Sequence, residues 1–308
     1  MKYLISHNDL DGLGPVILAL HLKLDFNKII VMHNINEIFD FHFFNDDEII
    51  ITDLSLTKEQ IKELNCKVII FDHHTVNNAE GFIDKNRCAT KIFCEEYLKN
   101  NNYNNFINVI DKYDRYIEDD RLFPFGYNMN ILLQNFTVGK HIDPFVVIYD
   151  DERISNVYDP FINKMLNYLS KGDFKGFVKL DKIIIKNFKE SRDKLYNEKV
   201  LKSLIIRKDS NDIEFGIING YFDPTEFGIK TLKNNPNMKY ILCYKTNINN
   251  GKLSVRSVVD FNILEYSKGL FKGHPNAAGC YMLPENVDLL IDGDIKDIFE
   301  LKKNEDYQ

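Results

Sequence analysis

The stretch VIIFDHH (residues 68–74) passes from an apolar β-strand pattern directly into one aspartate and two histidines. Two other apolar runs end in the same way, because YLIS is followed by His7 and IIIT is followed by Asp53. In an open parallel sheet, ligands bind beyond the carboxyl ends of the strands. Three strands that end in carboxylate or imidazole groups therefore predict a binding site along one edge of such a sheet.

The N-terminal part of the chain alternates short β-branched runs with helical patterns, which is typical of a parallel α/β sheet. We expect strands at about 2–6, 28–33, 48–53 and 67–71, and helices at about 13–24, 57–64 and 89–99. Ser55 or Thr57 is expected to cap the second of these helices.

Residues from about 104 to 200 carry mostly helical patterns, and strand patterns return at about 201–207, 213–219, 239–245 and 252–258. The stretch NNG at 249–251 suits a hairpin turn between the last two of these strands. The sequence thus predicts an α/β protein in three parts. These are an N-terminal parallel-sheet domain with a helical extension (1–170), a helical connector (171–200), and a smaller C-terminal α/β domain (201–308).

Bulk properties narrow the class of protein. The 308 residues have a formal net charge of -7, which argues against a surface for extended duplex nucleic acid, since such binding depends on clustered Lys and Arg. No apolar run approaches the roughly 18 to 20 residues that a membrane span needs. Asp and His also interrupt the N-terminus where a signal peptide would stay apolar. We therefore expect a cytoplasmic protein with no membrane partner.

The segment SHNDLDG (6–12) places His7, Asp9 and Asp11 at alternate positions. If the strand stays extended, alternate side chains point the same way, and three metal ligands share one face. An equally ordinary interpretation is that Asp9 and Asp11 form a turn and cap the next helix. This segment alone does not decide between the two.

Asp53 could likewise start a turn, whereas the run Asp72, His73 and His74 is harder to explain without function, because adjacent histidines point in different directions. Mixed imidazole and carboxylate ligands without thiolates favour Mn²⁺ over Ca²⁺. Two such ions roughly 3.5 to 4 Å apart need a shared carboxylate, and Asp53 is the candidate. His21, His33, His42 and His141 lack partner spacing, and we expect no functional role for them.

Three segments, SHNDLDG (6–12), ITDLS (51–55) and FDHH (71–74), resemble in the same order the motifs of the DHH superfamily of phosphoesterases. A fourth motif of that family contributes one more Asp, for which VIDKYDRY (109–116) offers Asp111 and Asp114, and we choose Asp114. The resemblance implies that His74 contacts the scissile phosphate or assists the leaving oxygen, and that Asp72 orients His73 or completes the metal coordination. It also implies two divalent ions, most simply Mn²⁺, held by His7, Asp9, Asp11, Asp53, His73 and Asp114.

The C-terminal region resembles the DHH-associated domain in LSVRSVVDF (253–261) and FKGHPNAAG (271–279). The resemblance implies a nucleotide clamp made by Arg256, Gly273, His274 and Asn276. The alternatives are a surface salt bridge for Arg256 and an ordinary turn for Gly273. Family members often carry three or four glycines before the histidine, where this chain has Leu, Phe, Lys and a single Gly.

The family resemblance implies a phosphodiesterase that hydrolyses short oligonucleotides to nucleoside monophosphates, closest to the nanoRNase branch. Two alternatives remain open at the level of sequence. One is hydrolysis of linear or cyclic dinucleotides or of 3′-phosphoadenosine phosphate, and the other is a nucleotide-binding regulatory module without catalysis. The expected partner is a short oligonucleotide or dinucleotide, and a homodimer is compatible with the sequence.

Overall fold

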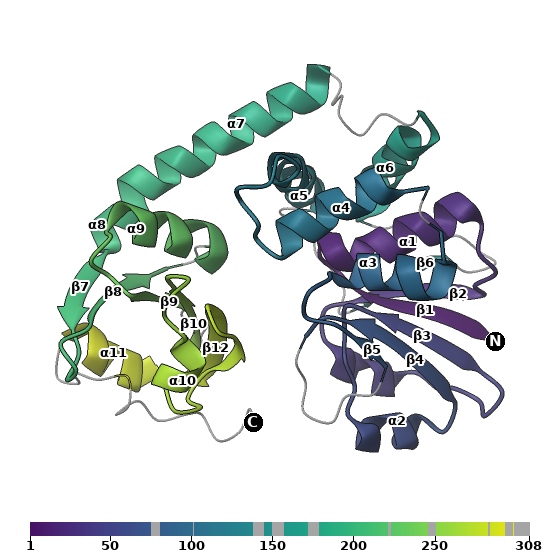
Figure 1. Ribbon diagram of the computed structural model, residues 1–308, viewed down its shortest axis with the longest axis horizontal. Helices are drawn as coiled ribbons and strands as arrows, with labels where there is room; N and C mark the ends of the chain where they lie inside the picture. Colours follow the sequence, from purple (N-terminus) through teal and green to yellow (C-terminus); the bar gives the residue numbers. More distant parts are fainter. Residues whose placement is uncertain are drawn as a thin grey trace. The chain divides into compact units, whose positions relative to one another are not determined.

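The computed structural model describes residues 1–74, 81–100, 102–137, 145–149, 157–171, 179–220, 223–245, 251–282, 284–292 and 298 (Figure 1). The chain divides into two compact units, Met1–Phe188 and Lys189–Gln308. Each unit contains its own six-stranded sheet and its own hydrophobic core. None of the helices in the described ranges has the length and apolarity that crossing a membrane requires.

The first unit is built on a sheet with the strand order β5-β4-β3-β1-β2-β6. The strands are β1 (Lys2–His7), β2 (Lys28–Met32), β3 (Glu48–Thr52), β4 (Lys67–Asp72), β5 (Phe82–Ile83) and β6 (Phe145–Tyr149). Strands β1 to β5 are parallel, and β6 pairs with β2 in the antiparallel direction. The four N-terminal strands expected from the sequence are confirmed, and β5 and β6 were not expected.

Helices cover both faces of this sheet, with α1, α3 and α4 on one side and α2 on the other (Figure 1). Their bounds are α1 (Leu10–Leu22), α2 (Lys58–Leu64), α3 (Ala89–Ile92) and α4 (Asn104–Asp114). Because successive residues of a strand face opposite sides, Leu4 of β1 packs in the α1 layer while Tyr3 and Ile5 pack in the α2 layer. Burial on both faces explains why the parallel strands read as continuous apolar runs.

The remaining segments of this unit include the 3-10 helix η1 (Ile35–Asp40) and the π-helical turn η2 (Phe93–Leu98), which continues α3. Helices α5 (Phe123–Thr137), α6 (Asp159–Lys171) and α7 (Lys179–Leu195) follow, and the boundary between the units falls within α7. Thr57, not Ser55, caps α2, because its hydroxyl accepts the N–H of Gln60 at 3.3 Å and the Gln60 side chain accepts the N–H of Thr57 at 2.9 Å.

The second unit has a sheet in the order β11-β12-β10-β9-β8-β7, antiparallel except for the pair β8 and β9. Its strands are β7 (Ile205–Lys208), β8 (Glu214–Asn219), β9 (Tyr240–Lys245), β10 (Gly251–Ser257), β11 (Lys272–His274) and β12 (Ala277–Met282). Residues 201–203 are helical (α8, Leu201–Ser203), so the first expected strand starts later than predicted. The antiparallel pairing of β9 and β10 fits the expected hairpin, whose turn residues 249 and 250 lie outside the described residues.

Short helical segments cover this sheet. They are the π-helical turn η3 (Tyr196–Val200), the π-helical turn η4 (Pro224–Gly228) and the helices α9 (Ile229–Asn234), α10 (Ile263–Tyr266) and α11 (Pro284–Asp292). The last part of α7 is held on this unit, because the Arg192 guanidinium donates to Glu226 at 2.6 and 2.9 Å and lies over the ring of Phe227. The protein is therefore an α/β chain with a largely parallel N-terminal sheet and a second sheet in the C-terminal unit, as the sequence predicts.

Candidate metal centre

The carboxyl ends of β1, β3 and β4 form one edge of the first sheet. The register aligns Ser6 of β1 with Thr52 of β3, so the residues that follow them, His7 and Asp53, are neighbours across the sheet. Strand β4 lies on the other side of β3 and ends at Asp72. Strand pairing alone thus brings the three strand-end residues of the sequence pattern to one place.

Asp53 stands at the middle of this edge and is 2% exposed. Its φ of 59° lies in the left-handed region, which Asp adopts more readily than most residues, and its N–H donates to the carbonyl of Phe71. One carboxylate oxygen is 3.3 Å from Nδ1 of His7, and the other is 3.4 Å from Nε2 of His73 and 3.7 Å from Nδ1 of His74. The two oxygens of Asp53 thus face two different sets of nitrogen atoms.

The SHNDLDG segment serves both as a helix start and as part of the site. Asp9 is the N-cap of α1, since its Oδ1 accepts the N–H of Gly12 at 2.9 Å, while its Oδ2 is 3.0 Å from Nδ1 of His7. A Cβ on residue 12 would lie 2.2 Å from the carbonyl oxygen of His7, so only glycine lets α1 begin this close to the end of β1. The capping and ligand interpretations of Asp9 are therefore compatible.

Asp11 joins the site to the start of α3. Its carboxylate accepts the N–H groups of Ala89 at 2.7 Å and Thr90 at 2.9 Å, and its Oδ2 is 3.9 Å from Nε2 of His73. Two backbone donors at a helix N-terminus favour a carboxylate and fix its orientation. Asp11 is thus held in place by groups that do not belong to the metal site.

Helix α4 presents Asp111 and Asp114 to different surroundings. Asp114 Oδ2 is 3.4 Å from Nε2 of His73, which brings this residue to the cluster. Asp111 is fully buried, and its Oδ1 accepts the N–H of Cys88 at 3.0 Å. Of the two candidates for the fourth-motif ligand, the structure places Asp114 beside the other predicted ligands.

Three overlapping groups of side chains bring their ligand atoms within 4.8 Å of one another. They are His7, Asp9 and Asp53; Asp53, Asp72, His73 and His74; and Asp11, His73 and Asp114. Asp53 belongs to the first two groups and His73 to the last two. Such sharing is the arrangement that two adjacent cations with a bridging carboxylate require.

Buried polar atoms normally have hydrogen-bond partners, so exceptions need an explanation. Among the described residues, four buried atoms of this cluster have none: Nδ1 of His7, both carboxylate oxygens of Asp53, and Oδ2 of Asp114. All four are oxygen or nitrogen atoms of the kind that Mn²⁺, Fe²⁺ or Zn²⁺ accept as ligands. The donor set therefore fits divalent metal ions.

The charges of the cluster also fit divalent metal ions. Burial, with repulsion from Asp9 and Asp11, holds the pKa of Asp53 well above its usual value. Burial, with repulsion from Asp11 and Asp53, does the same to the pKa of Asp114. Burial alone would lower the pKa of His7, but the carboxylates of Asp9 and Asp53 raise it to about 11. Without a metal ion, the pKa shifts of Asp53, Asp114 and His7 thus favour bound protons at these three residues.

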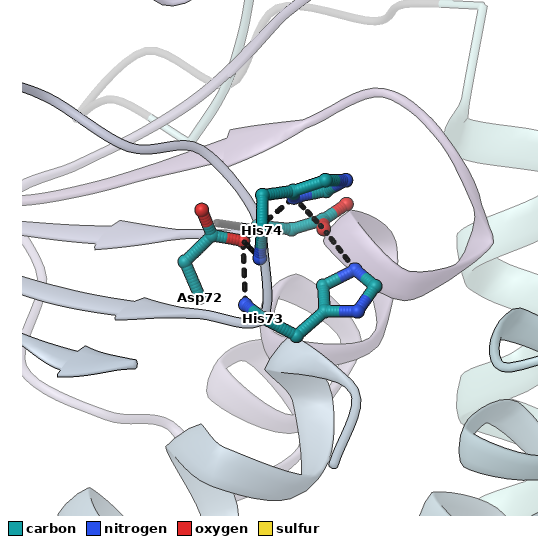
Figure 2. Close-up of side chains that lie close together, drawn as sticks. Asp72, His73 and His74 are labelled. Carbon is teal, nitrogen blue, oxygen red and sulfur yellow. Dashed lines mark hydrogen bonds and ion pairs between the residues drawn. The ribbon is translucent and has the colours of Figure 1, made fainter. Parts of the chain in front are cut away.

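Asp72 contacts His74 and the backbone around it (Figure 2). Its Oδ1 lies 2.8 Å from Nδ1 of His74 and accepts the backbone N–H of His73 at 2.7 Å, and the hydroxyl of Ser55 donates to its Oδ2. Burial would raise the pKa of Asp72, but the hydrogen bond with His74 holds it below its usual value. The sequence led us to expect that Asp72 orients His73 or completes the metal coordination. In the structure it accepts the backbone N–H of His73, contacts the ring of His74 and belongs to a group of possible metal ligands.

His33 lies at the same edge, although the sequence predicts no functional role for it. It follows β2 directly, its ring stacks with that of His7 at a centroid distance of 6.1 Å, and its Nδ1 is 3.5 Å from Oδ1 of Asn8. No motif spacing identifies it. Its position could have been predicted from the pairing of the strands, because β2 is parallel to β1 and its carboxyl end lies at the same edge of the sheet.

The predicted nucleotide-binding residues all lie in the second unit. On β10, the Arg256 guanidinium donates to the hydroxyl of Thr225 at 2.7 Å and to the carbonyl of Val255 at 2.8 Å. Gly273 and His274 lie on β11. Gly273 has a φ of 136°.

Gly273 and Asn276 also have a clear structural task. A Cβ on Gly273 would lie 2.7 Å from the carbonyl oxygen of Ala277, so the β11–β12 pairing requires glycine there. The side-chain amide of Asn276 donates to the carbonyls of Val258 at 2.7 Å and Phe261 at 3.1 Å, which fixes the turn after β10.

The chain is similar to known proteins in sequence and in fold. No protein-family model matches the chain. Over 327 residues the chain is 24% identical to oligoribonuclease NrnB of Bacillus subtilis strain 168, with 94% of this chain and 75% of NrnB covered.

Two solved structures share the fold. The pGpG-specific phosphodiesterase PggH of Vibrio cholerae has a TM-score of 0.57 at 15% identity, with 95% of this chain and 97% of that chain covered. The DHH domain of a member of a ribosomal protein family has a TM-score of 0.61 at 15% identity, with coverage of 98% and 87%. The chain thus shares the fold of these proteins, and its ordered motifs resemble those of the DHH superfamily of phosphoesterases.

Replacing Asp53 with asparagine tests whether the raised pKa of this buried carboxyl makes the stability of the protein depend on pH. A carboxyl whose pKa is raised in the folded state contributes stability at low pH that is lost as the pH rises through that raised pKa. In EDTA, the melting temperature of the wild type should therefore fall more steeply between pH 5 and 8 than that of Asp53→Asn. Expressed as free energy of unfolding, the pH-dependent loss of stability should be larger in the wild type by at least about 1 kcal/mol, the equivalent of roughly one pKa unit.

Mn²⁺ should raise the melting temperature of the wild type and have little effect on the variant. Equal pH profiles in EDTA would contradict this account.

The variants Asp114→Asn and Asp111→Asn form a matched pair on one helix. If Asp114 is the ligand that we predict, Asp114→Asn should weaken Mn²⁺ binding at least about tenfold and should leave the metal-free protein folded. Asp111→Asn should keep the Mn²⁺-induced rise in melting temperature while lowering the stability by about 1 to 3 kcal/mol, because a buried acceptor with nearby cations loses its charge. Calorimetric titration and thermal melts measure both effects. The reverse pattern would assign the ligand to Asp111.

Proposed function

We propose that this chain hydrolyses phosphodiester bonds in short oligonucleotides and releases nucleoside monophosphates. The observation that carries the proposal is the pair of ligand groups that share Asp53 at the carboxyl edge of the sheet. The similarity to an oligoribonuclease over 94% of this chain supports a short oligonucleotide as the substrate. A net charge of -7 agrees with a substrate too short to need a long basic groove.

We assign one metal position to His7, Asp9 and Asp53. We assign the second metal position to Asp11, Asp53, His73 and Asp114, so that the two positions share Asp53. When bound, two divalent ions supply Lewis acidity that favours hydroxide over water and stabilises negative charge on phosphate oxygens. We propose Mn²⁺, because the set is rich in carboxylates and contains no thiolate.

His74 is the proposed proton donor to the leaving oxygen. Asp72 fixes the ring by its contact with Nδ1, and we propose the other ring nitrogen, Nε2, as the donor atom. Burial would lower the pKa of His74, but the hydrogen bond with Asp72 raises it, so the imidazolium form is favoured. A positively charged, oriented imidazole can donate a proton or a hydrogen bond to a phosphoryl oxygen.

The second unit is the proposed nucleotide clamp, as the family resemblance implies. Arg256 offers a guanidinium held by the hydroxyl of Thr225, and such a fork suits a phosphate. His274 adds a second polar group at the end of β11. We propose that Gly273 and Asn276 act mainly by shaping the β11–β12 hairpin and the turn that follows β10.

A second candidate substrate is a linear dinucleotide. It is favoured by the likeness of the fold to a pGpG-specific phosphodiesterase, which covers 95% of this chain. Both candidates use the same metal centre and differ in how much of the substrate the nucleotide clamp has to hold.

The test is to incubate the full chain and Mn²⁺ with end-labelled di- to pentaribonucleotides, cyclic dinucleotides and 3′-phosphoadenosine phosphate. We expect mononucleotide products from the linear substrates, no activity in EDTA, and a rate that falls as the substrate lengthens. His74→Ala should lower kcat by about 10²- to 10⁴-fold, the usual range for loss of a general acid. His42→Ala, an exposed histidine of the same unit, is the matched control and should keep full activity. Nucleotide binding without hydrolysis of any substrate would show a regulatory module instead.

A further inference from the structure

Three cationic side chains converge on the buried carboxylate of Asp111. Lys91 Nζ is 3.8 Å, Lys112 Nζ is 3.9 Å and Arg115 Nη1 is 3.6 Å from the same oxygen, Oδ2. Because all three nitrogens lie around one atom, no two of them can be farther apart than twice the longest of these distances. We call Lys91, Lys112 and Arg115 the cation cluster.

The cation cluster holds more charge than Asp111 needs. One carboxylate neutralises one cation, and among the described residues the other acid that forms an ion pair with a member of the cluster is Asp120, 3.7 Å from Lys112. None of the three side chains donates a hydrogen bond to another described residue, and Oδ2 of Asp111 accepts none. With exposed fractions of 23%, 25% and 28%, the three side chains remain accessible from solvent. Three cationic side chains are therefore arranged around one point, with ion pairs to Asp111 and Asp120 but no hydrogen bond to another described residue.

The cation cluster lies next to the metal centre. The N–H of Cys88 donates to Asp111, and the next two N–H groups along the chain, of Ala89 and Thr90, donate to Asp11. Consecutive Cα atoms are about 3.8 Å apart, so the two carboxylates accept from amide groups that are neighbours along the backbone. On α4 the relation is as close, because Arg115 directly follows the proposed ligand Asp114.

We propose that the cation cluster binds a phosphate of the substrate other than the one that is cleaved. A phosphate supplies several acceptor oxygens and negative charge, which the unused donors lack within the protein. The inference rests on the proposed function and adds to it a selectivity for substrates that carry at least two phosphates. It also gives an acidic chain a local attraction for a short anionic substrate.

The kinetic test compares substrates that differ in phosphates alone. Substrates are NpN, whose single phosphate is the scissile one, pNpN, which adds a 5′-terminal phosphate, and NpNpN, which adds an internal one. Lys91→Gln and Lys112→Gln should each raise KM for a two-phosphate substrate about tenfold relative to KM for NpN, with little change in kcat, since each loses one charge-assisted contact. Each single variant leaves two cations beside Asp111, so folding should be retained.

Lys85→Gln is the matched control, because Lys85 is an exposed lysine a few residues before α3, and it should change none of these ratios. A larger effect on pNpN would identify the bound group as the terminal phosphate, and a larger effect on NpNpN would identify it as an internal one. Unchanged KM ratios in both lysine variants, or a loss of kcat that is equal for all substrates, would overturn the inference.

A second measurement separates this inference from the proposed function. In EDTA the acidic metal centre repels anions and should not bind phosphate. Inorganic phosphate should nevertheless raise the melting temperature of the wild type, because it binds to the cation cluster. The double variant Lys91→Gln, Lys112→Gln should lose at least half of that rise, and Lys85→Gln should keep it. This result is expected even if the chain cleaves none of the substrates. An equal rise in the double variant and the control would overturn the phosphate site.

Discussion

Buried carboxylates packed against one another at the carboxyl edge of the first sheet are the constraint on which the rest of the structure depends. Asp11 and Asp53 are almost fully buried, and Asp9 and Asp114 lie beside them. Like charges in a medium of low polarity repel strongly and need positive charge close by. The fold supplies part of it through backbone N–H groups at the starts of α1 and α3, and the remaining need is what suits this edge to divalent cations.

Much of the fold and the centre of the site follow from local sequence, because a strand pattern and the residue that ends it are both local properties. Knowing that β1, β3 and β4 are parallel neighbours is enough to bring His7, Asp53 and His73 together. The choice between Asp111 and Asp114 is different, since both lie on one helix and only the packing of α4 decides which faces His73. The role of Asp72 likewise depends on a ring orientation that no spacing encodes.

Other features could not be predicted from the sequence, because they depend on contacts between distant segments. Strand β6 pairs antiparallel with β2 across more than a hundred residues of chain, within a region of mostly helical patterns. His33 reaches the site only because β2 lies next to β1. In the second unit, the motif that suggested nucleotide contacts also fixes the backbone, as the hydrogen bonds of Asn276 show. A motif residue can thus serve the fold of its own loop, and its contacts in the structure are needed to separate the two roles.

The central claim is that two divalent ions bind at this edge with Asp53 between them. Electron paramagnetic resonance of the full chain during titration with Mn²⁺ tests it most directly. We expect two ions per chain, a spin-coupled signal that develops as the second ion binds, and loss of that coupling in Asp53→Asn. A single isolated Mn²⁺ signal in the wild type, or coupling that survives in Asp53→Asn, would contradict the account.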